Sequence, residues 1–244
     1  DKMAPVPSIS CAPSMRKIAV AMSDRSIALF DDKGKPRDRF GTKPLDAKFG
    51  KRSYLVLAVA FSPDGSCLAV GQSDNVVYVY RTGADWNEKK VIVNKLIQTA
   101  ATTAIQWPFD DKVILGMADG KVRVGLLKQN KCASLYKTDD GVVALATNPK
   151  RTAFASAHID GSVIIYNFSS KSQNKICTHP CAAYSLAFTA YCLVAAGADR
   201  RVICYTENGV IQQQFDYAKD DEKEFSAIAT DPTGQNFVLG SFDR

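Results

Sequence analysis

The sequence predicts an all-β fold, a β-propeller built from four-stranded antiparallel blades. Three observations lead to this prediction. Short apolar runs recur along the chain, an aspartate separates pairs of them at an interval of about 40 residues, and prolines mark a second turn in several repeats. With 244 residues and 46% hydrophobic content, the chain is also long enough to bury a substantial core.

The aspartate turns follow one pattern that occurs six times. An apolar run ends in a small residue, an aspartate comes two or three residues later, and a second apolar run follows, as in VGQSDNVVYVY at 70–80. Successive aspartates are 39 to 50 residues apart, close to the period of about 40 to 45 residues of a WD40-type blade. The six aspartates are Asp24, Asp74, Asp119, Asp160, Asp199 and Asp243.

We interpret these aspartates as structural residues of hairpin turns. A short carboxylate accepts backbone N–H groups of its own turn, and the Gly or Asn that follows it in several repeats tolerates the left-handed conformation of tight hairpins. Six catalytic aspartates at one repeat interval would serve no chemistry. We therefore expect equivalent turns on one rim of the propeller, with each carboxylate bonded to local amides.

The remaining strands follow from the residues around each aspartate. Six residues after it an aromatic recurs at Phe30, Tyr80, Tyr166 and Tyr205, where a standard blade has tryptophan, whereas the third repeat has Gly125. Upstream, a further apolar run ends in a turn containing proline, as in VAFSPDG, IQWPFDD, LATNPKR and IATDPTG, and we expect proline to stop the strand there. Two hairpins per repeat give the four strands of one blade.

The repeats also place the blade boundaries. The predicted blades are residues 1–50, 51–98, 99–138, 139–180, 181–222 and, in part, 223–244. Their central strands lack a polar face because each blade is covered on both sides by a neighbour. The Gly-His dipeptide of standard WD40 repeats is absent, so the array is divergent. About five and a half blades would leave an exposed sheet edge, which favours a fragment of a larger propeller protein.

One apolar segment has the length of a membrane span. Residues 176–198 contain no Asp, Glu, Lys or Arg. Pro180 and several polar residues interrupt the segment, however, and it divides into the runs YSLAF and CLVAAG. We interpret these runs as two buried strands.

Candidate chemical sites are few. The chain has no Gly-rich phosphate loop, no His-Glu-x-x-His motif and no nucleophile with a plausible base, so we expect no enzyme, no catalytic residue and no cofactor. Cys177, His179 and Cys181 alternate like metal ligands on one strand, but a fourth ligand would have to be His158 or Cys192, and we expect no metal. Seven cysteines without paired spacing indicate no disulfide framework and a reducing, cytosolic setting.

Two interblade connections contain the candidate partner-binding residues. The first offers Lys43, Lys48, Lys51, Arg52 and Tyr54, and the second offers Trp86, Lys89 and Lys90. The first is either a solvated linker or a surface for anionic lipid or nucleic acid, and the net charge of +6 allows nucleic acid without demanding it. The tryptophan beside lysines either contacts a protein or packs onto its own blade.

The connections also carry a family resemblance, over about residues 15–244. They contain, in order, RDRFGTKP, GKRSY, GQSDN, DWNEKK, QWP, FDYAKD and GSFDR. This order and spacing resemble the amino-terminal WD40 propeller of the intraflagellar transport protein 172 family, the largest subunit of the intraflagellar transport B complex. The resemblance implies a non-catalytic scaffold, present in the cytoplasm, cilium or flagellum and basal body, which mediates protein contacts in the trains that assemble cilia.

The resemblance also implies partners. They are other intraflagellar transport B subunits, including the subunit with a calponin-homology domain and a coiled coil, and we expect neither nucleic acid nor a small-molecule substrate. Two alternatives stay open from the residues alone. One is a coat-like propeller that binds an anionic membrane surface, and the other is a generic WD40 adaptor.

Overall fold

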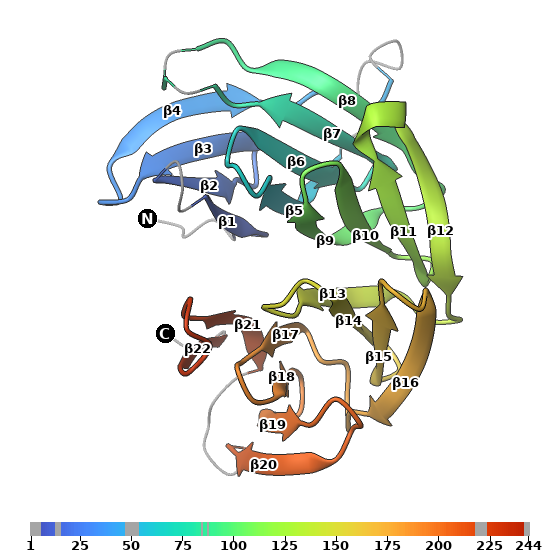
Figure 1. The fold of residues 1–244 in the computed structure, drawn as a ribbon. Helices are drawn as coiled ribbons and strands as arrows, with labels where there is room; N and C mark the ends of the chain where they lie inside the picture. The colour runs from blue at the N-terminus through green and yellow to red at the C-terminus, as the bar shows by residue number, and fades with distance from the viewer. Residues whose placement is uncertain are drawn as a thin grey trace. The chain divides into compact units, whose positions relative to one another are not determined.

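The computed structural model describes residues 6–12, 16–46, 54–83, 85–86, 88–217 and 224–241. Within them the chain consists of strands and turns, with one short helical segment, η2 (Leu127–Gln129). The strands form five four-stranded sheets and one two-stranded sheet in this part of the chain, and their pairing is antiparallel (Figure 1). The predicted all-β class is therefore confirmed. The described residues contain no helix long and apolar enough to cross a membrane.

The chain divides into two compact units, Asp1–Ala118 with Val122–Ser134 and Asp119–Lys121 with Leu135–Arg244. The first sheet contains β1 (Ile9–Ala12), β2 (Lys17–Ala21), β3 (Ser26–Asp31) and β4 (Pro36–Gly41). The second contains β5 (Val56–Phe61), β6 (Cys67–Gln72), β7 (Val76–Arg81) and β8 (Val91–Ile97). The third contains β9 (Thr102–Phe109), β10 (Lys112–Met117), β11 (Lys121–Leu126) and β12 (Lys131–Lys137). Each strand pairs with the next along the chain, so hairpins build every sheet.

The second unit contains the remaining sheets. The fourth is formed by β13 (Val142–Thr147), β14 (Ala153–His158), β15 (Ser162–Asn167) and β16 (Ser172–Thr178). The fifth is formed by β17 (Ser185–Phe188), β18 (Leu193–Ala196), β19 (Arg201–Tyr205) and β20 (Ile211–Asp216), and the sixth by β21 (Phe225–Thr230) and β22 (Phe237–Ser241). Each of the six sheets lies within one predicted blade, although the boundaries between blades stay a prediction.

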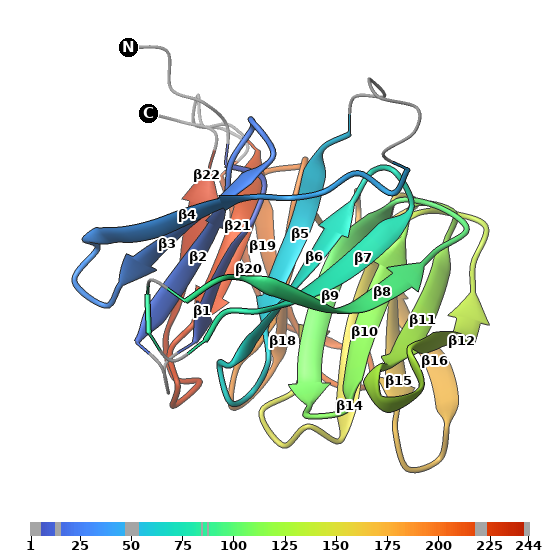
Figure 2. The same ribbon diagram turned by 90° about the horizontal axis from the view of Figure 1, so that it is seen from above.

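The apolar run of β7 shows how one strand serves two cores. Its alternate residues Val76, Tyr78 and Tyr80 pack with the first sheet, against side chains such as Ile27 and Leu29. Val77 and Val79 point the other way, into a core shared with the third sheet. The first two sheets lie side by side in both ribbon views (Figures 1 and 2). Burying one such side chain contributes about 1.5 to 3 kcal/mol, which explains the absence of a polar face.

The structure changes one expectation about the strands. Pro108 does not stop a strand, because β9 continues to Phe109 and the turn follows at Asp110. Pro108 lies between the paired residues Gln106 and Phe109, where the register of β9 with β10 shifts, and β9 is an edge strand, so the sheet tolerates a residue without an N–H there.

The third repeat lacks its aromatic for a reason of packing. A Cβ atom on Gly125 would lie 2.8 Å from Leu96 and 2.7 Å from Val113, so side chains of the neighbouring and same sheets occupy the space. In the apolar segment 176–198, the two predicted strands are confirmed as β17 and β18.

Candidate functional site

Four of the predicted turn aspartates accept a hydrogen bond from the backbone N–H two residues later. The bonds are Ser26 to Asp24 (3.1 Å), Lys121 to Asp119 (3.3 Å), Ser162 to Asp160 (2.9 Å) and Arg201 to Asp199 (3.2 Å). At Asp24 the hydroxyl of Ser26 donates a second bond, and these bonds lower the pKa of the carboxyl. The residues after the five described aspartates have φ values from 59° to 83°, the left-handed conformation of a tight hairpin. Asp243 lies outside the described residues.

Asp74 lies in the same kind of turn but holds a distant segment. Its carboxylate accepts the N–H of Leu45 at 2.7 Å, in the connection between the first and second sheets. The hydroxyl of Tyr78 donates to the carbonyl of Pro44 at 3.1 Å in the same connection. The turn aspartate of the second sheet thus positions the linker that precedes that sheet.

The suspected metal ligands are arranged differently from the prediction. His179 and Cys181 lie with Asp199, and their three donor atoms are within 4.8 Å of one another, whereas Cys177 is not part of this group. His179 Nδ1 is 2.9 Å from the hydroxyl of Tyr205, and its Nε2 is 3.7 Å from Asp199 Oδ1. The spacing of residues 177–181 does not predict Asp199 as a neighbour of His179 and Cys181, because Asp199 belongs to the next hairpin.

The environment of this group favours neutral side chains. Burial raises the pKa of the Cys181 thiol to about 11 and lowers the pKa of His179. The Cys181 sulfur already accepts the N–H of Asp199 at 3.2 Å. A metal ion would need the thiolate, so binding would have to displace a tightly held proton.

The two suggested fourth ligands have other partners. His158 Nδ1 is 2.9 Å from Thr138 Oγ1, and its Nε2 is 2.8 Å from Ser156 Oγ, which in turn is 2.8 Å from the hydroxyl of Tyr136. The sulfur of Cys192 is 3.3 Å from Thr189 Oγ1. The histidine therefore belongs to a buried network of hydroxyl groups and not to a metal-ligand set.

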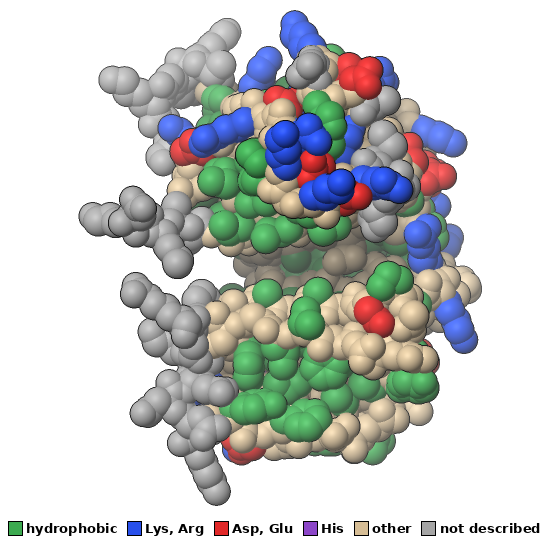
Figure 3. All heavy atoms as spheres, turned by 90° about the vertical axis from the view of Figure 1, so that its left-hand side faces the viewer, with side chains coloured by type: hydrophobic (Ala, Val, Ile, Leu, Met, Phe, Trp, Pro, Cys, Tyr) green, Lys and Arg blue, Asp and Glu red, His purple; other side chains and the backbone are tan. Residues whose placement is uncertain are grey.

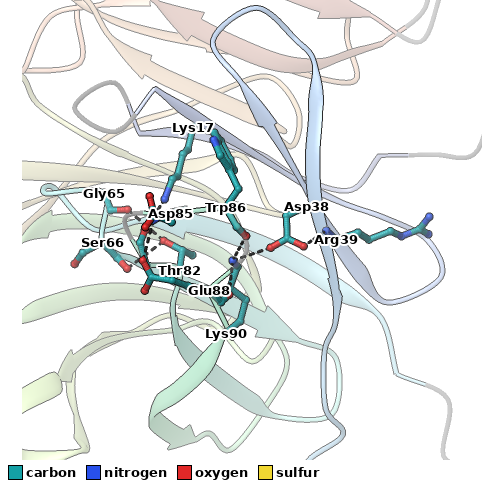
Figure 4. A network of polar contacts seen from close by, with 11 residues as sticks. Lys17, Asp38, Arg39, Gly65, Ser66, Thr82, Asp85, Trp86, Glu88 and Lys90 are labelled. Carbon is teal, nitrogen blue, oxygen red and sulfur yellow. Dashed lines mark hydrogen bonds and ion pairs between the residues drawn. The ribbon is translucent and has the colours of Figure 1, made fainter.

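The two candidate binding connections meet in the first unit. Trp86 is half-buried against the core of the first two sheets, and Lys17 Nζ lies 5.2 Å from the centre of its ring. Lys17 is itself buried, and its Nζ donates to the carbonyl of Gly83 (Figure 4). Because burial lowers the pKa of Lys17, this contact with the ring and the carbonyl compensates for lost hydration. Trp86 thus fastens the loop to β2.

Lys90 also holds the loop in place. Its side chain is 5% exposed, and its Nζ is 2.7 Å from Asp38 Oδ2 on β4 and 2.8 Å from the carbonyls of Trp86 and Glu88 (Figure 4). Three acceptors satisfy the three donors of the ammonium group. Lys90 is therefore a structural link between the loop and the first sheet, and it is not free to meet a partner.

Tyr54 is likewise used within the protein. It is 5% exposed, its hydroxyl donates to the carbonyl of Thr42 at 2.9 Å, and the Arg25 guanidinium lies 5.3 Å from its ring centre. Lys43 and Lys89 are exposed. The remaining candidates Lys48, Lys51 and Arg52 lie outside the described residues.

The exposed lysines border a groove of about 680 Å³ between the end of β4 and the start of β8, called the β4/β8 groove below. Its lining consists of Asp38, Phe40, Gly41, Lys43, Tyr80, Glu88, Lys89, Lys90, Val91 and Ile92. On the face shown in Figure 3, Lys and Arg side chains gather over the first unit, interspersed with carboxylates. Sequence reasoning named three of the groove's cations but not its apolar floor, which comes from strands that are distant in the chain.

Comparison with known proteins matches residues 44–81 to the family described as WD domain, G-beta repeat. Intraflagellar transport protein osm-1 of Caenorhabditis elegans is 59% identical over 244 residues, and the intraflagellar transport protein 172 homolog of Rattus norvegicus is 46% identical over 249 residues. Intraflagellar transport protein 172 of Chlamydomonas reinhardtii is 39% identical over 259 residues. Each comparison covers 100% of this chain. The resemblance to intraflagellar transport protein 172 is confirmed.

The relatives named intraflagellar transport protein 172 are much longer than this chain, which spans 14% of their length. Among solved structures, a chain in the crystal structure of the Mitotic Checkpoint Complex matches with a TM-score of 0.80 and 18% identity, covering 97% of this chain and 72% of that one. At this identity the match establishes the fold alone. The fold is a WD40-type β-propeller.

Proposed function

We propose that this chain is a non-catalytic docking domain of the intraflagellar transport B complex, which holds other subunits together in the trains that assemble cilia and flagella. Its partners are other subunits of that complex, including the one with a calponin-homology domain and a coiled coil. It works in the cytoplasm, at the basal body and in the cilium or flagellum. The observation that carries the proposal is the similarity to intraflagellar transport proteins over the whole chain.

The geometry of the first unit supports a docking role. The faces of propeller strands are buried between neighbouring sheets. A binding surface therefore has to come from connections and strand edges that a rigid frame holds in place. The buried contacts of Lys17 and Lys90 provide such a frame for the loop at 83–90. The described residues do bring a thiol, an imidazole and a carboxylate together at Cys181, His179 and Asp199. Burial raises the pKa of that thiol to about 11, however, and the imidazole contacts the hydroxyl of Tyr205, which supports a structural role for the group.

The test is capture of train subunits. The chain is immobilised and mixed with purified intraflagellar transport B subunits one at a time, and we expect at least one subunit to be retained at physiological salt. A matched column carrying an unrelated WD40 propeller serves as the control. Retention of none of the subunits, or equal retention by both columns, would contradict the proposal.

The membrane alternative is tested with the same protein. Liposomes with and without phosphatidylserine are sedimented with the chain, and the docking proposal expects little dependence on the anionic lipid. Strong binding that follows phosphatidylserine content and weakens with salt, together with no subunit capture, would favour a membrane-surface function.

A further inference from the structure

We propose that the β4/β8 groove binds an extended acidic segment of a protein partner. The proposal rests on the proposed docking function and specifies the chemistry of one docking site. Three features of the first unit carry it: an open strand edge, an apolar floor and a pair of cations that have no ion-pair partner among the described residues.

The open strand edge belongs to the first half of β8. This strand is outermost in its sheet, and among the described strands it pairs with β7 alone. Its second half is covered, because Asn130 Oδ1 accepts the N–H of Lys95 at 3.1 Å and the Asn94 side chain donates to Leu127 at 2.9 Å. Val91 at the start of the strand is 48% exposed. An added strand can therefore extend the sheet at this end and not at the other.

The floor of the groove is apolar and preformed. Phe40 from β4 and Tyr80 from β7 contact each other with ring centres 5.1 Å apart, and Ile92 packs against the same core. The groove has a volume of about 680 Å³ and is open to solvent, so a segment of another chain can enter it from outside. A lipid bilayer presents a flat surface of headgroups, whereas a single extended chain places alternate side chains on such a floor.

The charges around the floor select an acidic occupant. The lining has three lysines and two acids. Asp38 pairs with the buried Lys90, and Glu88 keeps its negative charge while accepting the N–H of Asp85 at 2.8 Å, so Lys43 and Lys89 leave a positive charge in excess. Lys43 and Lys89 are exposed and form no ion pair in the part of the chain that the structure describes. An extended segment with acidic residues alternating with apolar ones therefore matches both the floor and the rim.

The probe is a fluorescein-labelled ten-residue peptide in which glutamate alternates with valine, and a peptide with lysine in place of glutamate is its control. Binding to the full 244-residue chain is followed by fluorescence anisotropy. We expect the acidic peptide to bind and the basic one not to bind. Replacing both cations in one variant, K43E with K89E, should lower the affinity for the acidic peptide by about tenfold or more. Replacing two exposed lysines outside the groove, K33E with K128E, should change binding by less than about threefold.

Three outcomes of the peptide measurements would overturn the inference. They are equal binding of the two peptides, unchanged affinity in the groove variant, and equal loss in both double variants. In a vesicle assay, the groove variant could lose binding to phosphatidylserine vesicles and keep its affinity for the acidic peptide. That result would assign Lys43 and Lys89 to lipid and would also overturn the inference. If wild-type chain retains train subunits but fails these peptide tests, only the groove inference falls. If it binds the acidic peptide but retains no train subunit, the proposed function falls.

Discussion

At the scale of residues, the two histidines of the chain have similar buried environments. His158 and His179 are both buried, and burial lowers the pKa of each below the ordinary value of 6.5. Because the pKa of each histidine is lower in the folded chain than in the unfolded chain, the unfolded chain binds protons at a higher pH than the folded chain does. The stabilising contribution is then complete above about pH 6.5 and is lost as pH falls toward the folded pKa.

We therefore expect the free energy of unfolding, measured by urea titration, to fall from about pH 7 to about pH 5. The substitution His158→Gln should make this decline shallower, because one of the two depressed groups is gone. The reference is each protein's own value at pH 8, which removes the direct cost of the substitution. Parallel pH profiles for the variant and the parent would contradict the role assigned to His158.

The group of His179, Cys181 and Asp199 carries a second prediction. Since the thiol is held protonated and His179 already contacts Tyr205, we expect elemental analysis of the purified chain to find no stoichiometric zinc. Added cobalt should likewise give no thiolate charge-transfer band. One zinc ion per chain that disappears in the His179→Gln variant would show that the group is a metal site.

At the scale of elements, the hairpins depend on residues that accept a left-handed conformation. Gly161 follows the turn aspartate of the fourth sheet with φ of +83°, and a Cβ there would lie 2.2 Å from the carbonyl oxygen of His179. Gly34 has a similar φ of +75° but nothing within 4 Å of its Cβ position. Substituting alanine at Gly34 and at Gly161 therefore separates the cost of the left-handed conformation from the cost of a steric clash.

Gly34→Ala should cost about 1 to 2 kcal/mol of unfolding free energy, the penalty of the left-handed region alone. Gly161→Ala should cost clearly more, about 3 kcal/mol or above, because the carbonyl oxygen that the Cβ meets belongs to the backbone of His179 and cannot move aside like the end of a flexible side chain. Both values come from chemical denaturation of the single variants. Equal costs at the two positions would mean that the hairpin at Gly161 relaxes freely.

At the scale of the whole molecule, charge sets how partners arrive. The net charge is +6, and on the face shown in Figure 3 the cations gather over the first unit. A field of this sign speeds the approach of acidic partners, and salt screens it beyond about 8 to 10 Å. We expect the association rate constant of the acidic peptide, measured by stopped flow, to fall as salt rises from about 50 to 300 mM, with a smaller change in the dissociation rate constant. A larger change in dissociation would argue against long-range steering.

The sequence by itself determined the hairpins, because their signals are local. An aspartate, a residue that tolerates positive φ and two flanking apolar runs define a turn within about a dozen residues. The repeat interval then fixed the WD40-type class. The hairpins of Asp24, Asp119, Asp160 and Asp199 each form from their own neighbours, because the N–H two residues after each aspartate donates to its carboxylate.

Only the tertiary structure decided which polar and aromatic side chains of the connections stay available. Trp86, Lys90 and Tyr54 have the residue types of a binding surface, yet each is used inside the first unit by a partner from another segment, Lys17, Asp38 and Thr42 respectively. Asp74 holds Leu45 in the same way. Burial and ion pairing depend on which segments the sheets bring together, and that proximity is not encoded in the spacing of any single motif. The groove with its exposed Lys43 and Lys89 is what remains after those internal contacts are made.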